Sequence, residues 1–300
     1  MKLDIIGDIH GQLDALRALG RHLGSAVDED WSHSEGRVVV FLGDLVDRGP
    51  ASLEVAELVC ELAQRDRALC LLGNHEYNLL RGETKRSNRD TLADVRHRPA
   101  RWAPVLAFFA TLPTAIELPE LRLIHAVWHR DCCARVHRII GRRPRRDGTG
   151  DRMAQLRDAV VLGSPFEGDR PVQGLPELGV PPARDTALEI LIKGFEEKAA
   201  APLLDNDGRE RELERVCWWK GPHPDVVSDR LTVFGHYGNA PPVGGVHEAF
   251  VPPYPSGHAK LRRWQHEGAP HVPPAGAVDV PTAERAVCVD YNGVTQTETG

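Results

Sequence analysis

The chain has 300 residues, of which 41% are hydrophobic and 27% are charged, and its formal net charge is -6. This composition excludes a fibrous or an intrinsically disordered protein, because the chain has enough apolar side chains to fill a core. The negative balance argues against a protein that coats nucleic acid, since such binding depends on a dense field of lysine and arginine. We therefore expect a globular protein without an extended nucleic-acid surface.

Two further features of the sequence bear on the cellular compartment of the protein. Six cysteines are scattered without a CxxC pair, and a chain of this length does not need disulfide staples. The opening MKLDII is too short an apolar stretch, and is charged too soon, for a signal peptide or a membrane span. We expect reduced thiols, a cytoplasmic location and no membrane partner.

The first part of the chain predicts strands that alternate with helices. Three short apolar runs, each followed by a glycine, predict buried strands over residues 3–6, 38–42 and 69–72. Leucines at helical spacing predict a helix over residues 13–23, and a similar stretch predicts a second helix over residues 52–64. The order βαβαβ is typical of parallel strands joined by crossover helices. Ligands of such sheets gather beyond the carboxyl ends of the strands.

The rest of the chain predicts three more strands and two irregular stretches. The strands are expected over residues 121–124, 231–234 and 286–289. The irregular stretches, over residues 138–182 and 241–281, are rich in proline or glycine. Since the predicted strands extend along nearly the whole chain and no repeat divides it, we expect one domain over residues 1–300.

Four polar motifs follow predicted strands: GDIHG at residues 7–11, GDLVDRG at 43–49, GNHE at 73–76 and GH at 235–236. Taken singly, an Asp-x-His triplet is commonly a capped turn, and a buried histidine is commonly a core residue. The ordered set of four instead predicts one site with carboxylate, amide and imidazole ligands. Such donors without a thiolate suit Mn, Fe or Zn, and a carboxylate such as that of Asp44 can bridge two ions.

These motifs resemble the signature of the calcineurin-like metallophosphoesterase superfamily, which is GDxHG, GDxxDRG and GNHE followed by two later histidines. The resemblance implies an α/β fold, a four-layer sandwich in which two mixed β-sheets are flanked by helices. It implies a hydrolase with two divalent or trivalent metal ions, manganese or iron ahead of zinc. The metal ligands that it implies are Asp8, His10, Asp44, Asn74, His125 and His236, with Asp44 shared by both ions.

Details of the motifs favour one branch of the superfamily. The chain ends its last motif as GHYG at residues 235–238, without the second histidine of the GHxH ending found in many phosphodiesterases and nucleases. Its DRG and GNHE segments resemble the phosphoprotein phosphatases and the bacterial symmetrical diadenosine tetraphosphatases. By this resemblance His75 is the general acid, Asp47 orients it and Arg48 binds phosphate. Each role is physically sound, because a carboxylate sets a histidine tautomer and a guanidinium fork matches phosphate oxygens.

The second half of the chain leaves alternatives open. His125 is followed by AVWH, whereas these phosphatases usually have a glycine soon after this histidine, so His129 remains an alternative ligand. This segment and the stretch over residues 215–219 resemble a bacterial subgroup of the phosphatases. Trp218 and Trp219 fit either nucleobase stacking or the core, and we favour the core for at least one of them.

Two polar stretches have plain interpretations. DNDG at residues 205–208 predicts a β-turn, because the later acidic ligand of a calcium loop is missing. The arginine-rich run at residues 142–146 predicts a solvated loop, with binding of a polyphosphate or a phosphoprotein as the alternative.

Three hypotheses on function remain. The first is a serine/threonine protein phosphatase-like enzyme that hydrolyses phosphate monoesters. The second is a hydrolase of dinucleoside polyphosphates such as diadenosine tetraphosphate. A non-catalytic phosphate-recognition module comes last, because every expected ligand type is present. The expected partner is a phosphoprotein, a small phosphate ester or a dinucleoside polyphosphate.

Overall fold

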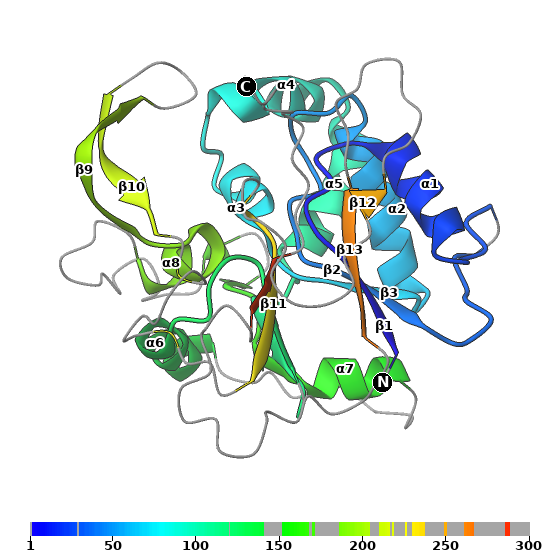
Figure 1. The fold of residues 1–300 in the computed structure, drawn as a ribbon. Coiled ribbons are helices and arrows are strands. Elements are labelled where there is room, and N and C mark those ends of the chain that lie inside the picture. Colours follow the sequence, from blue (N-terminus) through cyan, green and yellow to red (C-terminus); the bar gives the residue numbers. More distant parts are fainter. Residues whose placement is uncertain are drawn as a thin grey trace, which may run out of the picture.

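The computed structural model describes residues 2–28, 30–119, 121–140, 152–167, 170–171, 186–204, 210–216, 218, 226, 230–237, 249–250, 261–266 and 286–288. Within these residues two five-stranded sheets lie next to each other (Figure 1). The strand order is β12-β13-β1-β2-β3 in the first sheet and β14-β11-β5-β4-β6 in the second. Each sheet contains parallel and antiparallel pairs, so the prediction of two mixed sheets is confirmed.

Parallel strands form the centre of the first sheet. They are β1 (Leu3–Ile6), β2 (Val38–Phe41) and β3 (Ala68–Cys70), joined by helices α1 (Leu13–His22) and α2 (Ser52–Gln64). The predicted βαβαβ order is confirmed. At the other side of β1, β13 (Leu261–His266) pairs antiparallel with β1 and carries β12 (Ala249–Phe250). Our prediction of an irregular stretch over 241–281 is wrong for these two strands, because their pairing depends on a partner from the start of the chain.

The second sheet is built around β5 (Leu121–Ile124) and β11 (Leu231–Phe234), which run parallel, with β14 (Ala286–Cys288) parallel to β11. Strand β4 (Ala115–Glu117) pairs antiparallel with β5 and with β6 (Val160–Leu162). Strand β6 follows helix α7 (Arg152–Asp158) and precedes the short pair β7 (Phe166–Glu167) and β8 (Arg170–Pro171). The expected irregular stretch over 138–182 therefore contains regular elements.

Helices cover the outer faces of both sheets. Helices α1 and α2 lie outside the first sheet, and α6 (Arg130–Ile140) and α8 (Ala187–Lys193) lie outside the second (Figure 1). The other elements are α3 (Asn74–Leu80), the 3-10 helix Arg86–Asn88, α4 (Arg89–His97) and α5 (Pro99–Phe109). Strands β9 (Glu196–Leu204) and β10 (Glu210–Arg215) form an arm that projects from the body. None of the helices in the described ranges is long and apolar enough to span a membrane.

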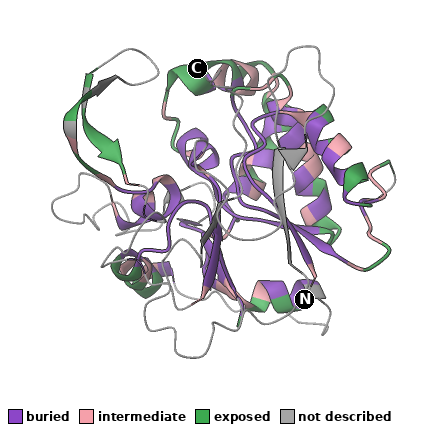
Figure 2. Ribbon diagram, in the orientation of Figure 1, coloured by how far each residue is buried: buried purple, intermediate pink, exposed green. Residues whose placement is uncertain are grey.

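Alternation of side chains along the strands divides the core into two parts. Leu3 and Ile5 of β1 pack with Leu123 and Val233 between the sheets, whereas Ile6 points to the other face, toward the helices. Figure 2 shows that the central strands coloured by burial are buried, whereas exposed residues lie on outer helix faces, on loops and on the arm.

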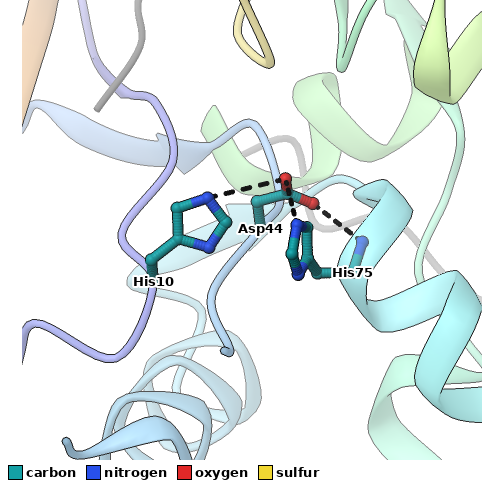
Figure 3. Close-up of side chains that lie close together, drawn as sticks. All are labelled: His10, Asp44 and His75. Atoms are coloured by element: carbon teal, nitrogen blue, oxygen red, sulfur yellow. Dashed lines mark hydrogen bonds and ion pairs between the residues drawn. The ribbon is translucent and has the colours of Figure 1, made fainter. Parts of the chain in front are cut away.

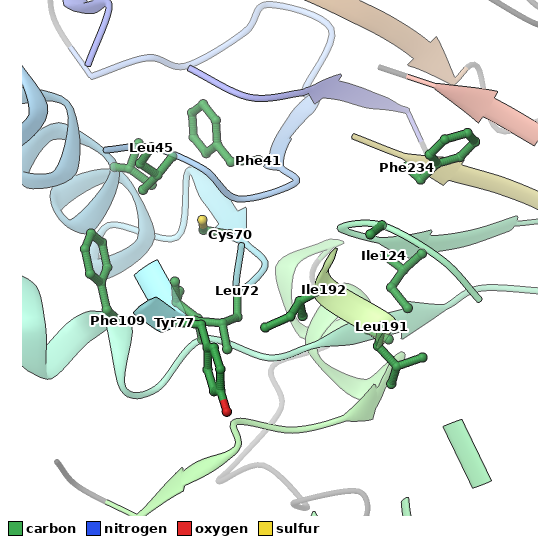
Figure 4. Close-up of a cluster of buried hydrophobic side chains, with 14 of the residues drawn as sticks. Phe41, Leu45, Cys70, Leu72, Tyr77, Phe109, Ile124, Leu191, Ile192 and Phe234 are labelled. Atoms are coloured by element: carbon green, nitrogen blue, oxygen red, sulfur yellow. The ribbon is translucent and has the colours of Figure 1, made fainter. Parts of the chain in front are cut away.

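The part of the core that contains Ile6 continues beneath the loops at the carboxyl ends of the strands. Leu45 and Leu72, which follow β2 and β3, pack there with Tyr77 of α3 and Leu191 of α8 (Figure 4). The loops therefore rest on a packed core that holds their backbone in place.

Candidate active site

The carboxyl ends of five strands carry all the predicted ligands. Asp8 and His10 follow β1, Asp44 follows β2, Asn74 and His75 begin α3 after β3, His125 follows β5, and His236 follows β11. The backbone N–H of Gly235 donates to the carbonyl of His125 at 2.8 Å. The backbone N–H of His236 donates to Oδ1 of Asp8 at 3.2 Å. Both sheets therefore contribute to one site.

Asp44 lies at the centre of this site and is 1% exposed. Its Oδ2 is 3.9 Å from Nε2 of His10 and 3.8 Å from Nε2 of His75 (Figure 3). Its Oδ1 is 3.4 Å from Nε2 of His125. A carboxylate with nitrogen donors beside both oxygens is suited to bridge two cations.

Two groups of donor atoms share Asp44: His10, Asp44 and His75 form one, and Asp44, His125 and His236 form the other. Within each group the donor atoms lie within 4.8 Å of one another. Asp8 borders the first group, with its Oδ2 3.8 Å from Nε2 of His10. The side chain of Asn74 borders the second, 3.3 Å from Nε2 of His125. The predicted ligands therefore surround two adjacent positions.

The structure separates the two candidate histidines of the second half. His125 contacts Asp44, whereas His129 packs edge-on against the ring of Phe195, with ring centroids 5.8 Å apart. His129 also lies against the first turn of α6, where the N–H of Cys132 donates to its Nδ1 at 3.4 Å. His125 is the histidine that the fold brings to the site.

Backbone carbonyls orient two of the imidazoles. Nδ1 of His125 lies 2.7 Å from the carbonyl oxygen of Leu42, and Nδ1 of His10 lies 2.9 Å from that of Val46. Because a carbonyl oxygen only accepts, Nδ1 of each ring carries a proton. In the neutral rings Nε2 then holds a lone pair, as histidines that ligate a metal require.

The polar atoms of the second group fit a cation. The amide nitrogen of Asn74 donates to Nδ1 of His236 at 2.6 Å and to Oδ2 of Asp44 at 3.3 Å, so this side chain ties the second group together. Nε2 of His236 is buried and has no hydrogen-bond partner among the residues that the structure describes. A buried imidazole nitrogen without a partner is unfavourable unless a ligand such as a cation meets it. Carboxylate, amide and imidazole donors suit Mn, Fe or Zn.

Several residues of the site have a backbone in the left-handed region. Among the described residues seven that are not glycine have positive φ, and five of them are predicted site residues: His10 (48°), Asp44 (53°), Asp47 (72°), Arg48 (65°) and His236 (70°). Side chains other than glycine rarely adopt this conformation, and each instance costs on the order of 1–3 kcal/mol. The packed loops hold these residues in strained positions, as is common where side chains must converge.

His75 forms a close pair with Asp47. Nδ1 of His75 lies 2.5 Å from Oδ2 of Asp47, and both residues are buried. The backbone N–H of Asp47 donates to Oγ of Ser52 at 2.9 Å, which fixes the loop. The backbone N–H of His75 donates to Oδ1 of Asp44 at 2.9 Å. This histidine is therefore held by one carboxylate while its Nε2 faces another.

Arg48 is the exposed member of the predicted set. Its side chain forms no hydrogen bond or ion pair with any residue that the structure describes. Its charge nevertheless reaches the site, because it contributes to lowering the pKa of His10. An exposed guanidinium group near the donors suits an anionic ligand.

Glu76 is a site residue whose role the sequence analysis missed. It is fully buried, and its carboxylate accepts hydrogen bonds from the backbone N–H groups of Asp44 (2.8 Å), Leu45 (2.8 Å), Val46 (3.3 Å) and Gly73 (3.2 Å). One side chain thereby joins the loop after β2 to the start of α3. A glutamate at the third position of a helix is a capping signal, and it was the only local clue.

Burial and mutual charge shift the pKa values of the site. Burial lowers the pKa of His10 and of His236 well below the usual value, and a nearby arginine lowers each further. Burial acts to raise the pKa of Asp44, but His125 and His75 lower it more strongly, so the carboxyl stays ionised. Burial, followed by the charge of Asp44, raises the pKa of Glu76 to about 7. Neutral imidazoles beside an ionised carboxylate are the forms that bind a cation.

The remaining predictions have mixed outcomes. Trp218 is 2% exposed and packs against Phe234, with ring centroids 4.6 Å apart, so its assignment to the core is confirmed. Trp219, the DNDG turn at 205–208 and the arginine-rich run at 142–146 lie outside the described residues. Among the described cysteines, Cys60, Cys70, Cys132 and Cys133 form no disulfide.

Comparisons with known proteins agree with the motifs. Residues 1–142 match the family model described as calcineurin-like phosphoesterase. An asymmetrical bis(5'-nucleosyl)-tetraphosphatase from Oceanobacillus iheyensis is 44% identical over 82 residues, which are 27% of this chain and 33% of that protein. A symmetrical bis(5'-nucleosyl)-tetraphosphatase from Nitrosococcus oceani is 28% identical over 256 residues, covering 79% of this chain and 82% of that protein.

Among solved structures, a protein serine/threonine phosphatase from Saccharomyces cerevisiae matches with a TM-score of 0.44 and 18% identity, over 79% of this chain and 61% of that chain. The match to the Oceanobacillus protein spans about a third of that relative's length.

Proposed function

Because residues 1–142 of this chain match the family model described as calcineurin-like phosphoesterase, we propose that the protein hydrolyses a phosphoric ester or anhydride with the help of two metal ions. The observation that supports this most is the position of Asp44, whose two oxygens lie beside the nitrogen donors of different histidine groups. A single carboxylate in this position is what a two-ion centre requires.

In this proposal six side chains hold the ions. Asp8, His10 and Asp44 hold the first, and Asp44, Asn74, His125 and His236 hold the second. When bound, the ions polarise the phosphate group and lower the pKa of a water molecule. The oxygen and nitrogen donors support manganese or iron, with zinc as the alternative.

Three further side chains act on the substrate. Nε2 of His75 donates a proton to the oxygen that leaves the phosphorus atom, and Asp47 stabilises the protonated ring through Nδ1. Arg48 binds phosphate oxygens with its exposed guanidinium group. The distances and the exposure reported above support these roles, and none of the three side chains is a proposed metal ligand.

For the substrate we propose a dinucleoside polyphosphate. Two relatives carry the name bis(5'-nucleosyl)-tetraphosphatase, which supports this class. The order of our sequence-based hypotheses is thereby reversed, since phosphate monoesters stood first there. Monoesters remain the second candidate, because the His75–Asp47 pair supplies the proton that an alkoxide leaving group needs. A non-catalytic recognition module stays third.

The experiment is a substrate panel after controlled metal loading. The protein is stripped with a chelator, reloaded with Mn, Fe or Zn, and assayed on diadenosine tetraphosphate, a phosphopeptide, p-nitrophenyl phosphate and a phosphodiester. We expect turnover only after reloading, fastest with diadenosine tetraphosphate. Phosphate binding without turnover on any substrate would favour the recognition module. Asp44→Asn is the matched negative control, since it removes the shared carboxylate with little change in size.

We also propose that residues 1–300 form one domain. Each sheet takes strands from distant parts of the chain, since β1 pairs with β13 and β5 pairs with β11. Limited proteolysis that released a stable fragment ending between β3 and β13 would contradict this.

A further inference from the structure

A cavity of about 830 Å³ lies beside β3, the last strand of the first sheet, and apart from the candidate active site. It is bounded by β3, the end of α3, helices α5 and α7, and the chain that follows β6. Among the described residues that line it, none is a proposed metal ligand, and Asp47, Arg48 and His75 are absent as well. Small-molecule sites in proteins typically have volumes of about 300–1,000 Å³. The cavity is therefore large enough for a ligand of its own.

The walls of this cavity are mostly apolar. Leu79 of α3, Met153 of α7 and Phe166 of β7 belong to the lining and are buried. Ala103 and Ala107, one turn apart on α5, also line it and are exposed, so the cavity reaches the surface at this helix. Protein interiors are close-packed and contain few voids larger than a water molecule. An apolar space of this size is more than a packing defect and indicates a binding pocket.

The two hydroxyl groups of the lining already have partners within the protein. Oγ of Ser164 donates to the carbonyl oxygen of Ala110 at 2.5 Å and accepts from the backbone N–H of Phe166 at 3.1 Å. Oγ1 of Thr111 donates to the carbonyl oxygen of Phe108 at 2.7 Å. Because both protons of these hydroxyls are used, a ligand in the cavity meets no free O–H donor.

The thiol and the single charge of the described lining are also satisfied. Sγ of Cys70 donates to the carbonyl oxygen of Leu71 at 3.2 Å. The guanidinium group of Arg157 forms an ion pair with Asp66. A charged ligand would lose its hydration here without gaining a free counter-charge, which is strongly unfavourable. A peptide segment would bring backbone N–H and C=O groups that need partners, and these side chains offer none. The lining therefore favours an uncharged ligand of hydrocarbon character.

We propose that this cavity is a second binding site of the protein, and that it takes one uncharged small molecule of hydrocarbon character, such as a medium-length alkyl chain or fused rings. Removal of the apolar surface of the ligand from water stabilises the complex. Cavities lined by apolar side chains stay dry and take up apolar molecules. An anionic phosphate compound is not a ligand of this cavity, so the site is independent of the function proposed above.

The test titrates the full chain with N-phenyl-1-naphthylamine, an uncharged probe whose fluorescence rises in apolar surroundings. We expect one equivalent of the probe to bind. 1-Decanol should displace the probe at a concentration at least about tenfold lower than decanoate, because the two share an alkyl chain but decanoate would bury an unpaired charge. No binding of the probe, or displacement by both competitors at equal concentrations, would overturn the proposal.

A substitution on α5 locates the bound probe. Ala107→Phe places a ring at the surface end of the cavity, so the affinity for the probe should fall roughly tenfold or more. Ala100→Phe is the matched control, because Ala100 is an exposed alanine of the same helix outside the described lining, and its affinity should stay within about twofold of wild type.

Thermal unfolding shows whether each variant keeps its fold, and Ala103→Phe repeats the test one turn away should Ala107→Phe not fold. Equal affinities in wild type and both α5 variants would place the probe elsewhere and overturn the proposal. Equal losses at the lining position and at Ala100 would overturn it as well.

Discussion

Nδ1 of His75 and Oδ2 of Asp47 lie 2.5 Å apart in the interior of the protein. The pair joins the first turn of α3 to the loop after β2. Because the Asp47 carboxylate can only accept a hydrogen bond, Nδ1 of His75 carries the proton between them. Nε2 of the same ring points to the donor groups, 3.8 Å from Asp44. This geometry suits a general acid.

Replacing His75 by asparagine should separate substrates by the quality of their leaving groups. His75→Asn should keep both metal ions, because the proposed ligands remain. General acid catalysis typically supplies about 10²–10⁴-fold, and mostly when the leaving oxygen is strongly basic. We therefore expect a far larger loss of kcat/KM on an alkyl phosphate than on p-nitrophenyl phosphate. Metal content by elemental analysis is the control, and equal losses on both substrates would assign His75 to phosphate positioning.

Asp47→Asn should show a weaker form of the same pattern. The imidazole stays, but its tautomer is no longer set by a carboxylate and its protonated form is less stable. The substrate dependence should be in the same direction and smaller. A variant that loses its metals instead would show that Asp47 supports the loop rather than the acid.

Asp44 and Arg48 should have separable roles. Asp44→Asn removes the charge shared by both donor groups, so metal binding and activity should both fall to background. Arg48→Ala removes an exposed group, so both metals should stay while KM rises and kcat falls. Equilibrium metal binding and steady-state kinetics on the same preparations test this. Equal metal loss in the two variants would mean that Arg48 is structural.

Glu76→Ala should be strongly destabilising although Glu76 is not a proposed ligand. The substitution leaves four backbone N–H groups without their acceptor, in the loop after β2 and at the start of α3. Since a buried donor left unsatisfied costs about 1–3 kcal/mol, the free energy of unfolding should fall by at least about 2 kcal/mol. Glu61→Ala on the exposed face of α2 is the control. Urea unfolding measures both, and a loss as small as that of the control would disprove the role.

Two glycines with positive φ should respond differently to alanine. At Gly43 (φ +105°) a Cβ would lie 2.5 Å from the backbone nitrogen of Gly73, so Gly43→Ala should push apart the loops after β2 and β3 and weaken metal binding. At Gly82 (φ +66°) nothing lies within 4 Å, so Gly82→Ala should cost only the backbone strain of about 1–2 kcal/mol and keep activity. Metal titration together with thermal unfolding distinguishes close approach from strain.

The sequence by itself determined the order of the first elements and the residues of the site. Strands β1, β2 and β3 and helices α1 and α2 are specified by local apolar patterns, and the polar motifs follow them directly. Parallel strands connected by helices bring their carboxyl ends to one edge, so the first three motifs had to meet. This is why the proposed ligands could be named before their distances were known.

Tertiary structure alone decided the rest, because it depends on contacts between residues far apart in the chain. Strand β13 exists by pairing with β1, and no local pattern in its own stretch indicates this. The choice of His125 over His129 follows from the close approach of the two sheets. Glu76 acquires its role from N–H groups of another loop, and Arg215 at the end of β10 lies over the ring of Tyr237, which follows a different strand. A side chain's neighbours in space, unlike its periodicity, are fixed only once distant segments pack together.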